Sequence, residues 1–512
     1  MWHPISPPRR WPARWSRSMS ACWPAGADPL RSERRRLDRG YILVLALALV
    51  LYLVTAAPTV LWGDDAELQR RAVLLQWEAG PRDHPLYILW AHIFTYLPCG
   101  DPAFRVNLCS AVSGALGAAL AYVLLRRLDV GQFAAGLGAG ALAVSHAYWM
   151  HSVRAEVYTP YLMLFAGFLL AGLRWLKEGR PAALALASFL LGLSLAVHPM
   201  ALTALPAAAL LFLHARWKPA LLGLAGLLAG AGIALALHQH GPAGTHWGAH
   251  LTATLVGMWQ AVPGLPARTL LAAGFALYQF PLTFLLAVPG WRALWHERRR
   301  AAWFLALAWL GDVLFALLFP APDGYVFFLP AYFITALCIG LGMERLLRRW
   351  GHPLRLAAGA LLAPVLLYFL LPLSLNALGW NPLGLRQLPY RDGNWFHLWP
   401  AKTAYWGPRR YGEEALVSLP AHAVVLADHT LRQNLLYFQQ VEGRRPDVWI
   451  VEIYSGQGRQ VPFIAGLLGQ RPIFAAAVDR YLDPEVTAAY CLRPAGLLYQ
   501  ILPREGSDAR CP

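Results

Sequence analysis

Charged residues are scarce in this sequence, and their scarcity excludes most soluble classes of protein. Only 14% of the 512 residues are charged and 57% are hydrophobic, whereas about 25% charged residues is usual in globular domains. A soluble chain of this length would divide into several domains with polar surfaces, which this composition does not supply. Long apolar stretches recur instead, and they predict a multi-pass membrane protein.

Several common signatures are also missing. The six cysteines show no metal-ligand spacing, and there is neither a glycine-rich phosphate loop nor an internal repeat. Residues 1–40 lack the apolar core and the cleavage site of a signal peptide. We therefore expect a basic, disordered cytoplasmic tail over 1–40, or a start codon placed too early. Cys491 and Cys511 share a hydrophilic segment and would pair if that segment lies outside the cytoplasm.

The net charge of +16 does not indicate nucleic-acid binding, because the arginines form short clusters between apolar runs. Such an alternation is the positive-inside pattern of membrane proteins. With the N-terminus inside, every predicted cytoplasmic loop is basic, and the opposite loops carry few basic residues for their length. The predicted cytoplasmic loops are RRLDVG, RWLKEGR, HARWKP, WRALWHERRR and ERLLRRWGHPLR.

Apolar runs within residues 41–375 predict about eleven transmembrane helices. An odd number of spans places residues 376–512 outside the cytoplasm, which would be the periplasm of a bacterial inner-membrane protein or the lumen of an organelle. The predicted spans are 41–61, 105–125, 131–149, 157–174, 181–197, 200–214, 218–237, 268–289, 301–320, 325–346 and 353–375, and the outward loops are 62–104, 150–156, the turn at 198, 238–267 and 320–324.

Residues 376–512 differ in character from the rest of the chain. The runs AVVLA and DVWIV flank an amphipathic stretch, which is typical of a strand, a helix and a second strand. A small extracytoplasmic α/β domain is therefore expected after the last span.

The first outward loop, 62–104, places three carboxylates directly after an apolar run. Asp64, Asp65 and Glu67 begin a predicted surface helix over 64–80, and Arg70 or Arg71 is spaced to pair with Glu67. In one interpretation the two aspartates cap this helix and its polar face is merely solvated. In the other they belong to a site.

The remaining candidate residues lie in the same outward loops. His84-Pro85 begins a second short apolar helix that is too short to span, and His84 is either structural or part of the site. His151, Arg154 and Glu156 meet where two predicted spans join, and Arg154 and Glu156 could simply neutralise each other. Asp312 lies inside a predicted span, where a packing or folding role is favoured.

Carboxylates, histidines and an arginine thus gather on one face of the bilayer. A carboxylate there could take a proton from an acceptor hydroxyl or hold a divalent metal. Arginine and histidine could stabilise a departing phosphate through charge-assisted hydrogen bonds. The residues alone predict an outward-facing site that acts on an amphiphile with a polar head.

The sequence resembles the GT-C superfamily of membrane glycosyltransferases, and within it the protein O-mannosyltransferase-like branch, formerly a domain family of unknown function. The apolar first span, the Asp-bearing outer loop and the extracytoplasmic C-terminal part carry the general likeness. The matching stretches are WGDDAEL (62–68), HPLYILWAHIFTYLPCGDPAFRVNLCSAVSGALGAALAY (84–122), HSVRAEVYTPYLMLF (151–165) and YVFFLPAYFITALCIGLG (325–342).

The resemblance implies an aspartate soon after the first span as the catalytic base or a metal-associated carboxylate. Asp64 is the first choice and Asp65 the second, and either would hold the metal if one is present. Many members have Asp-x-x-Glu directly after Trp, whereas here Gly63 intervenes, so the choice stays open. Other members also have His-Pro-Pro-Gly where this chain has only His84-Pro85-Leu86.

The resemblance also implies the partners. The donor would be a sugar, a hexose such as mannose, on a polyprenyl phosphate, and the acceptor a protein hydroxyl or an envelope glycan or lipid. Arg154 is assigned to the donor phosphate, with Glu156 as its partner or a second carboxylate, and Glu67, His84 and His151 are further substrate-binding candidates.

Two other functions compete with glycosyl transfer. A transporter or flippase of lipid-linked sugars would show inverted repeats and polar groups at mid-membrane, and neither is clear in this sequence. A non-catalytic assembly protein would act through its α/β segment, 376–512. A cavity opening onto the first outward loop would favour transfer, whereas a path between both faces would favour transport.

Overall fold

The computed structural model describes residues 39–77, 83–240, 247–321, 324–382, 384–456, 458–479 and 481–504. The chain divides into two units, 1–39 and 40–512, and all the described residues except Arg39 belong to the second. The predicted cytoplasmic tail and the predicted partner of Cys491, Cys511, lie outside the described residues.

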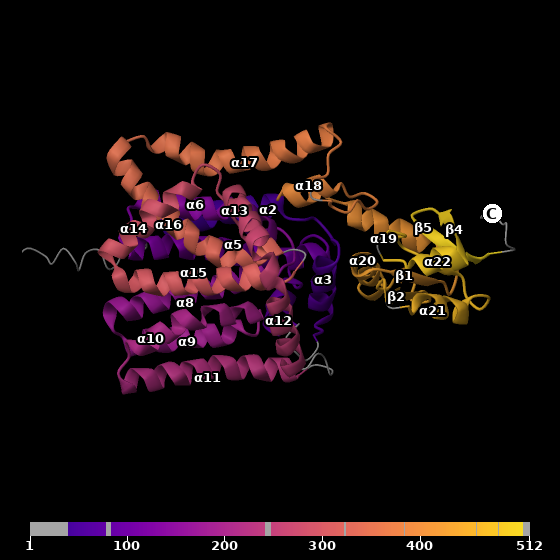
Figure 1. Cartoon of the computed structure of the whole chain (residues 1–512), viewed down its shortest axis with the longest axis horizontal. Helices are drawn as coiled ribbons and strands as arrows, with labels where there is room; N and C mark the ends of the chain where they lie inside the picture. The colour runs from indigo at the N-terminus through magenta and orange to yellow at the C-terminus, as the bar shows by residue number, and fades with distance from the viewer. Residues whose placement is uncertain are drawn as a thin grey trace, which may run out of the picture. The chain divides into compact units, whose positions relative to one another are not determined.

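Apolar helices make up the first part of the second unit (Figure 1). Many of them are hydrophobic all round, which is typical of helices surrounded by lipid and by other helices. They are α2 (Arg39–Thr55), α3 (Asp64–Leu74), α4 (Pro85–Phe94), α5 (Pro102–Arg127), α6 (Gln132–Ala143), α7 (His146–Ser152), α8 (Tyr158–Glu178), α9 (Pro181–Ser194), η1 (Pro199–Ala204), α10 (Leu205–Leu213), α11 (Trp217–Gln239), α12 (Trp247–Ala261), η2 (Val262–Gly264), α13 (Leu265–Gln279), η3 (Phe284–Leu286), α14 (Ala287–Glu297), α15 (Arg299–Leu318), η4 (Gly324–Phe328), α16 (Leu329–Trp350) and α17 (Pro353–Ala377).

A helix occurs at each predicted span, but fewer than eleven of the described helices have the length and composition of a membrane span. Within the described ranges, six helices are long and apolar enough to cross a membrane, or seven if a bent pair counts as one span. The chain is therefore an integral membrane protein, and eleven crossings remain a prediction. The six are α5, α8, α11, α15, a span over 324–350 and a span over 355–377.

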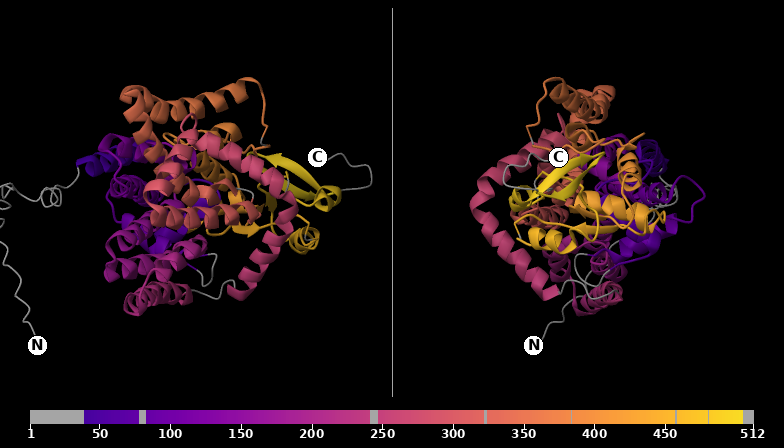
Figure 2. Two further views of the ribbon diagram at one scale, coloured as in Figure 1. Left: turned by 60° about the vertical axis from the view of Figure 1, so that its left-hand side comes forward. Right: turned by 90° about the vertical axis from the view of Figure 1, so that its right-hand side faces the viewer.

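Two of the predicted elements are wrong in detail. The predicted span 268–289 is broken, because α13 ends at Gln279, Leu282 adopts a positive φ of 64°, and the chain bends by 101°. The predicted loop 238–267 contains α12, which continues through η2 into α13 as a long curved helix (Figure 2). Apolar residues recur four apart at Leu251, Leu255 and Trp259, which is the spacing expected of a helix. Because the segment has few charged residues, no polar face marks this spacing in the sequence.

Asp312 is fully buried in α15. Its Oδ2 accepts a hydrogen bond of 3.0 Å from the N–H of Ala331, in the first turn of α16. Because that N–H has no partner within its own helix, the contact joins two helices, in keeping with the favoured packing role.

A mixed five-stranded sheet follows, in the order β2-β1-β3-β5-β4. The predicted strand, helix and second strand are confirmed as β1, α20 and β2. Strand β1 is parallel to β2 and β3, and β5 is antiparallel to β3 and β4. The elements are α18 (Gly393–Leu398), α19 (Gly407–Val417), β1 (Val424–Ala427), α20 (His429–Gln440), β2 (Trp449–Glu452), α21 (Gln460–Leu467), β3 (Ile473–Ala475), α22 (Pro484–Ala489), β4 (Tyr490–Ala495) and β5 (Leu498–Pro503).

Side-chain alternation along β1 divides the core of this sheet between two faces. Val424 and Leu426 pack with residues of α21 and α22. Val425 and Ala427 pack with α19 and α20, and the same cluster contains Trp62, Ala66 and Ala103 of the first outward loop. The sheet region and the first outward loop therefore share one hydrophobic core. Whether residues 376–512 form a separate domain outside the cytoplasm stays a prediction.

Candidate functional site

Helix α20 of the sheet region packs directly against α3 of the first outward loop. The backbone N–H of Gly63 donates to the carbonyl of Thr430 at 3.1 Å. Gly63 has φ of 53° and ψ of −127°, a combination that is strained for any residue with a Cβ. The glycine that separates Trp62 from Asp64 thus permits the turn that brings the loop onto α20.

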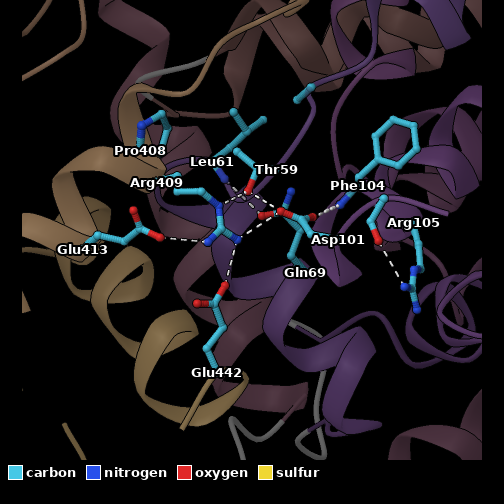
Figure 3. Close-up of polar contacts among 12 residues, drawn as sticks. Thr59, Leu61, Gln69, Asp101, Phe104, Arg105, Pro408, Arg409, Glu413 and Glu442 are labelled. Atoms are coloured by element: carbon cyan, nitrogen blue, oxygen red, sulfur yellow. Dashed lines mark hydrogen bonds and ion pairs between the residues drawn. The ribbon is translucent and has the colours of Figure 1, made fainter. Parts of the chain in front are cut away.

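An arginine from the start of α19 links the same two parts (Figure 3). The guanidinium of Arg409 donates to Thr59 Oγ1 at 2.7 Å and to Asp101 at 3.0 Å, both on the transmembrane side. It also pairs with Glu442 at 2.7 Å and Glu413 at 3.1 Å on the sheet side. This set of four contacts, called the Arg409 clamp below, fixes the segment that leads into the acidic loop.

Asp64 and Asp65 are adjacent in sequence but lie in different surroundings. Neither side chain caps α3 through a hydrogen bond, because the N-cap is Gly63 and both aspartates lie in the first turn. The interpretation in which the two aspartates cap this helix is therefore wrong. Carboxylates are still favoured there by the helix dipole. Asp64 is exposed and lines a cavity, whereas Asp65 is 4% exposed and is not among the residues that line it.

His429 at the N-terminus of α20 joins Asp64 to the sheet region. Its Nε2 lies 2.8 Å from Asp64 Oδ1 and 3.5 Å from Glu67 Oε2, and its Nδ1 lies 3.2 Å from Glu452 Oε1. Burial lowers the pKa of His429, but the bonds to Asp64 and Glu452 outweigh it and raise the pKa to about 10. The imidazole is therefore charged at neutral pH, beside Asp64.

Asp64, Glu67 and His429 together supply atoms that could bind a cation. One ligand atom each from Asp64, Glu67 and His429 lie within 4.8 Å of one another. Nitrogen and oxygen donors of this kind suit a divalent transition metal, and Glu452 is placed to orient the imidazole from its other nitrogen. A cation would have to displace the proton on His429 Nε2, so its binding would compete with acid.

Asp65 belongs to a buried cluster behind the cavity. The guanidinium of Arg154 lies 3.4 Å from Asp65 and 2.7 Å from Glu156. Burial raises the pKa of Asp65 well above its ordinary value, against the opposing effect of Arg154. Although burial also opposes ionisation of Glu156, Arg154 and His151 hold its pKa below the usual range. His151 lies 3.7 Å from Glu156.

The predicted site residues thus fall into two groups. Asp64, Glu67, His84 and Glu156 line the cavity, whereas Asp65, His151 and Arg154 do not appear among its lining residues. The predicted pairing of Glu67 with Arg71 is confirmed at 2.5 Å.

The cavity has a volume of about 950 Å³ and two chemically different ends. Charged and imidazole side chains from the first loop, the α7–α8 connection and the start of η1 form the polar end, and His250 adds an imidazole from α12. Leu251 and Leu255 of α12 and Leu314 and Leu318 of α15 contribute to the apolar end. The polar lining residues include Asp64, Glu67, Arg71, Asp83, His84, Glu156 and His198.

Sequence reasoning missed His429, Glu452, Arg409 and His198. A signal for His429 was available, since Asp428 and His429 directly follow β1, and the carboxyl ends of parallel strands are frequent positions for functional side chains. Arg409 and Glu452 carry no such local signal.

The fold is a GT-C fold. The structure superposes on ArnT from Cupriavidus metallidurans with a TM-score of 0.55, 15% identity and coverage of 91% of this chain and 98% of that one. That crystal structure contains undecaprenyl phosphate, and the apo crystal structure of the same protein matches over 90% of this chain, also with a TM-score of 0.55.

One protein family is similar to this chain over a segment of its N-terminal half. Residues 64–221 match the family model described as "Protein O-mannosyl-transferase TMEM260 N-terminal domain". The chain is 36% identical over 149 residues to "Protein O-mannosyl-transferase TMEM260" of Mus musculus, and this match spans 29% of the chain and 20% of the mouse protein. The predicted resemblance to GT-C proteins, and to the O-mannosyltransferase branch within them, is confirmed.

Proposed function

We propose that this protein is a membrane glycosyltransferase that moves a hexose such as mannose from a polyprenyl-phosphate donor to a protein hydroxyl or to an envelope glycan or lipid. The observation that carries the proposal is the two-ended cavity beside Asp64. Its apolar end suits a polyprenyl chain within the bilayer, and its polar end suits a phosphate and a sugar. The family of the matched segment supports mannosyl transfer to a protein, and the undecaprenyl phosphate bound by ArnT supports the donor class.

Asp64 is assigned as the general base. Its carboxylate would accept the proton of the acceptor hydroxyl while that oxygen attacks the anomeric carbon. The bond from the anomeric carbon to the phosphate oxygen breaks, and polyprenyl phosphate leaves with the electron pair. A single displacement of this kind inverts the anomeric centre. Asp65 is assigned a supporting role, because it is buried against Arg154.

We assign the donor phosphate to a position near Arg71. Both arginines are paired with two carboxylates, Arg71 with Glu67 at 2.5 Å and Asp83 at 2.8 Å, and Arg154 with Asp65 and Glu156. Of the two, Arg71 is the one that lines the cavity. We therefore transfer to Arg71 the role that the sequence suggested for Arg154. If a divalent metal is bound, Asp64, Glu67 and His429 are the ligands we assign, and the cation would neutralise charge on the phosphate.

The location of the cavity favours transfer over transport. Its lining residues come from the first loop, the start of α8, η1, α12 and the C-terminal half of α15. These segments gather at the end of the bundle where the first loop lies. We place this end on the outer face of the bacterial inner membrane, with the N-terminus in the cytoplasm and the sheet region in the periplasm.

The test is mass spectrometry of envelope glycoproteins, glycans and lipids from cells with and without this protein. A hexose that disappears from a defined acceptor, and returns with the wild-type chain but not with Asp64→Asn, would support the proposal and identify sugar and acceptor together. Unchanged glycosylation, together with altered distribution of a lipid-linked sugar between the leaflets, would support a flippase instead.

A further inference from the structure

Two His-Pro steps that are distant in sequence meet at the polar end of the cavity. His84-Pro85 begins α4, and His198-Pro199 begins η1. The N–H of Leu86 donates to the carbonyl of Ala196 at 3.0 Å, which holds the two steps together. The two imidazole rings stack, with centroids 5.3 Å apart and 8° between their planes. Both histidines line the cavity.

Backbone hydrogen bonds fix opposite tautomers in the two rings. His84 Nδ1 lies 2.7 Å from the carbonyl oxygen of Val197, which can only accept, so Nδ1 carries the hydrogen. His198 Nδ1 accepts a hydrogen bond of 3.0 Å from the N–H of Met200, so its hydrogen is on Nε2. In the neutral rings, His84 presents a bare Nε2 and His198 presents an Nε2–H.

The neutral state of the pair follows from its surroundings. Burial is the largest influence on His84 and lowers its pKa, against the opposing effects of the Val197 hydrogen bond, Asp83 and Glu156. Burial also lowers the pKa of His198 well below its ordinary value. Two charged imidazoles stacked face to face would also repel each other. Among the described residues, no hydrogen bond is made by either Nε2, so both remain available for a ligand.

Aromatic rings enclose the His198 side of the pair. The ring of Tyr158 lies 5.6 Å and that of Phe327 6.2 Å from the ring of His198, measured between centroids, and both residues line the cavity. An apolar wall next to a few placed polar atoms is the usual composition of a small-molecule site. One acceptor beside one donor matches a hydroxyl group, which both donates and accepts. A phosphate oxygen only accepts and would meet the lone pair of His84.

We propose that His84 and His198 together bind one hydroxyl of the donor sugar, which donates to His84 Nε2 and accepts from His198 Nε2–H. This inference rests on the proposed function and names the part of the site that reads the sugar. The pair determines specificity and takes no part in proton transfer. Removing either partner should lower kcat/KM on the order of 10- to 100-fold, since each lost bond leaves a desolvated polar atom.

The test uses the full chain in proteoliposomes with polyprenyl-phosphate mannose and polyprenyl-phosphate glucose, and with the four monodeoxy analogues of whichever is transferred. His84→Phe and His198→Phe keep a stacked ring and remove the polar atoms. His214→Phe is the control, because His214 is exposed and lies outside the cavity lining. Binding of each donor to the purified protein is measured in parallel.

For wild type, we expect one of the deoxy donors to have a kcat/KM at least about 10-fold lower than the full sugar, on the order of one lost hydrogen bond. Both His→Phe variants should have the same kcat/KM for the full sugar and for that deoxy donor. Their kcat/KM for the deoxy donor should equal that of wild type. Equal losses by the variants on every donor would overturn the pairing. Donor binding without transfer would refute the proposed function. The pair would then be tested by whether the same deoxy donor binds more weakly than the full sugar to wild type but equally well to the two variants. No binding of any donor would overturn both.

Discussion

Replacing Arg409 with methionine tests whether the Arg409 clamp holds the sheet region against the acidic loop. The substitution keeps most of the apolar stem and removes the guanidinium. Two bonds across the junction are lost, to Thr59 and Asp101. Bonds to charged groups contribute about 1.5–3 kcal/mol each. The Arg409 side chain is 16% exposed and that of Asp101 22%, so we take the lower end and expect about 3 kcal/mol.

The amide of Gly63 reports this loss directly, because its partner is the Thr430 carbonyl on the sheet side. A loss of about 3 kcal/mol should speed its hydrogen exchange roughly 100-fold. The amide of Ala57 is an internal reference, since it bonds to Val153 within the transmembrane part. Arg410→Met is the matched control at an exposed neighbouring position. Unchanged exchange at Gly63 in a folded Arg409→Met protein would refute the clamp.

Three further outcomes are expected. Gly63→Ala should destabilise the loop by about 1–3 kcal/mol because of its positive φ, seen as faster proteolysis of the first loop, whereas Gly136→Ala, where a Cβ meets open space, should not. Against the effect of burial, Asp64 and Glu452 raise the pKa of His429 from 6.5 to about 10. The stabilisation from these pairs is therefore complete below pH 6.5 and is lost as pH rises through about 10. Wild-type transfer should fall there, and a pH profile of His429→Gln that keeps the same fall would contradict this role of His429. At pH 7 the protonated His429 already supplies a positive charge beside Asp64, so EDTA should leave transfer unchanged; loss of transfer that Mg²⁺ or Mn²⁺ restores would assign a metal instead.

The sequence was informative where a signal is local. Apolar runs located the helices, and β-branched runs located β1 and β2. The four-residue spacing of Glu67 and Arg71 predicted their pair, which lies on one helix face. The hydrophobic period and the spacing of residues are properties of a single helix or strand. Both can therefore be recognised in the sequence without knowing how helices and strands pack together.

Contacts between distant segments could not be read in this way. Asp64 and Asp65 are neighbours in sequence, yet helical geometry directs one toward His429 and the cavity and the other toward Arg154. The partner of Asp64 comes from a helix 365 residues further along the chain. A break such as that at Leu282 depends on packing, and the apolar composition of the segment gives no warning of it.

The assignment of Asp64 as the general base is tested by single-turnover transfer of labelled hexose from polyprenyl phosphate by the purified chain. Asp64→Asn, Asp65→Asn and the double variant are compared with Asp129→Asn, which replaces an exposed carboxylate that pairs with Lys177 and Arg298. Loss of the base should slow transfer by about 10²- to 10⁴-fold in Asp64→Asn, and Asp129→Asn should match wild type. Transfer at the wild-type rate by the correctly inserted double variant would contradict the account.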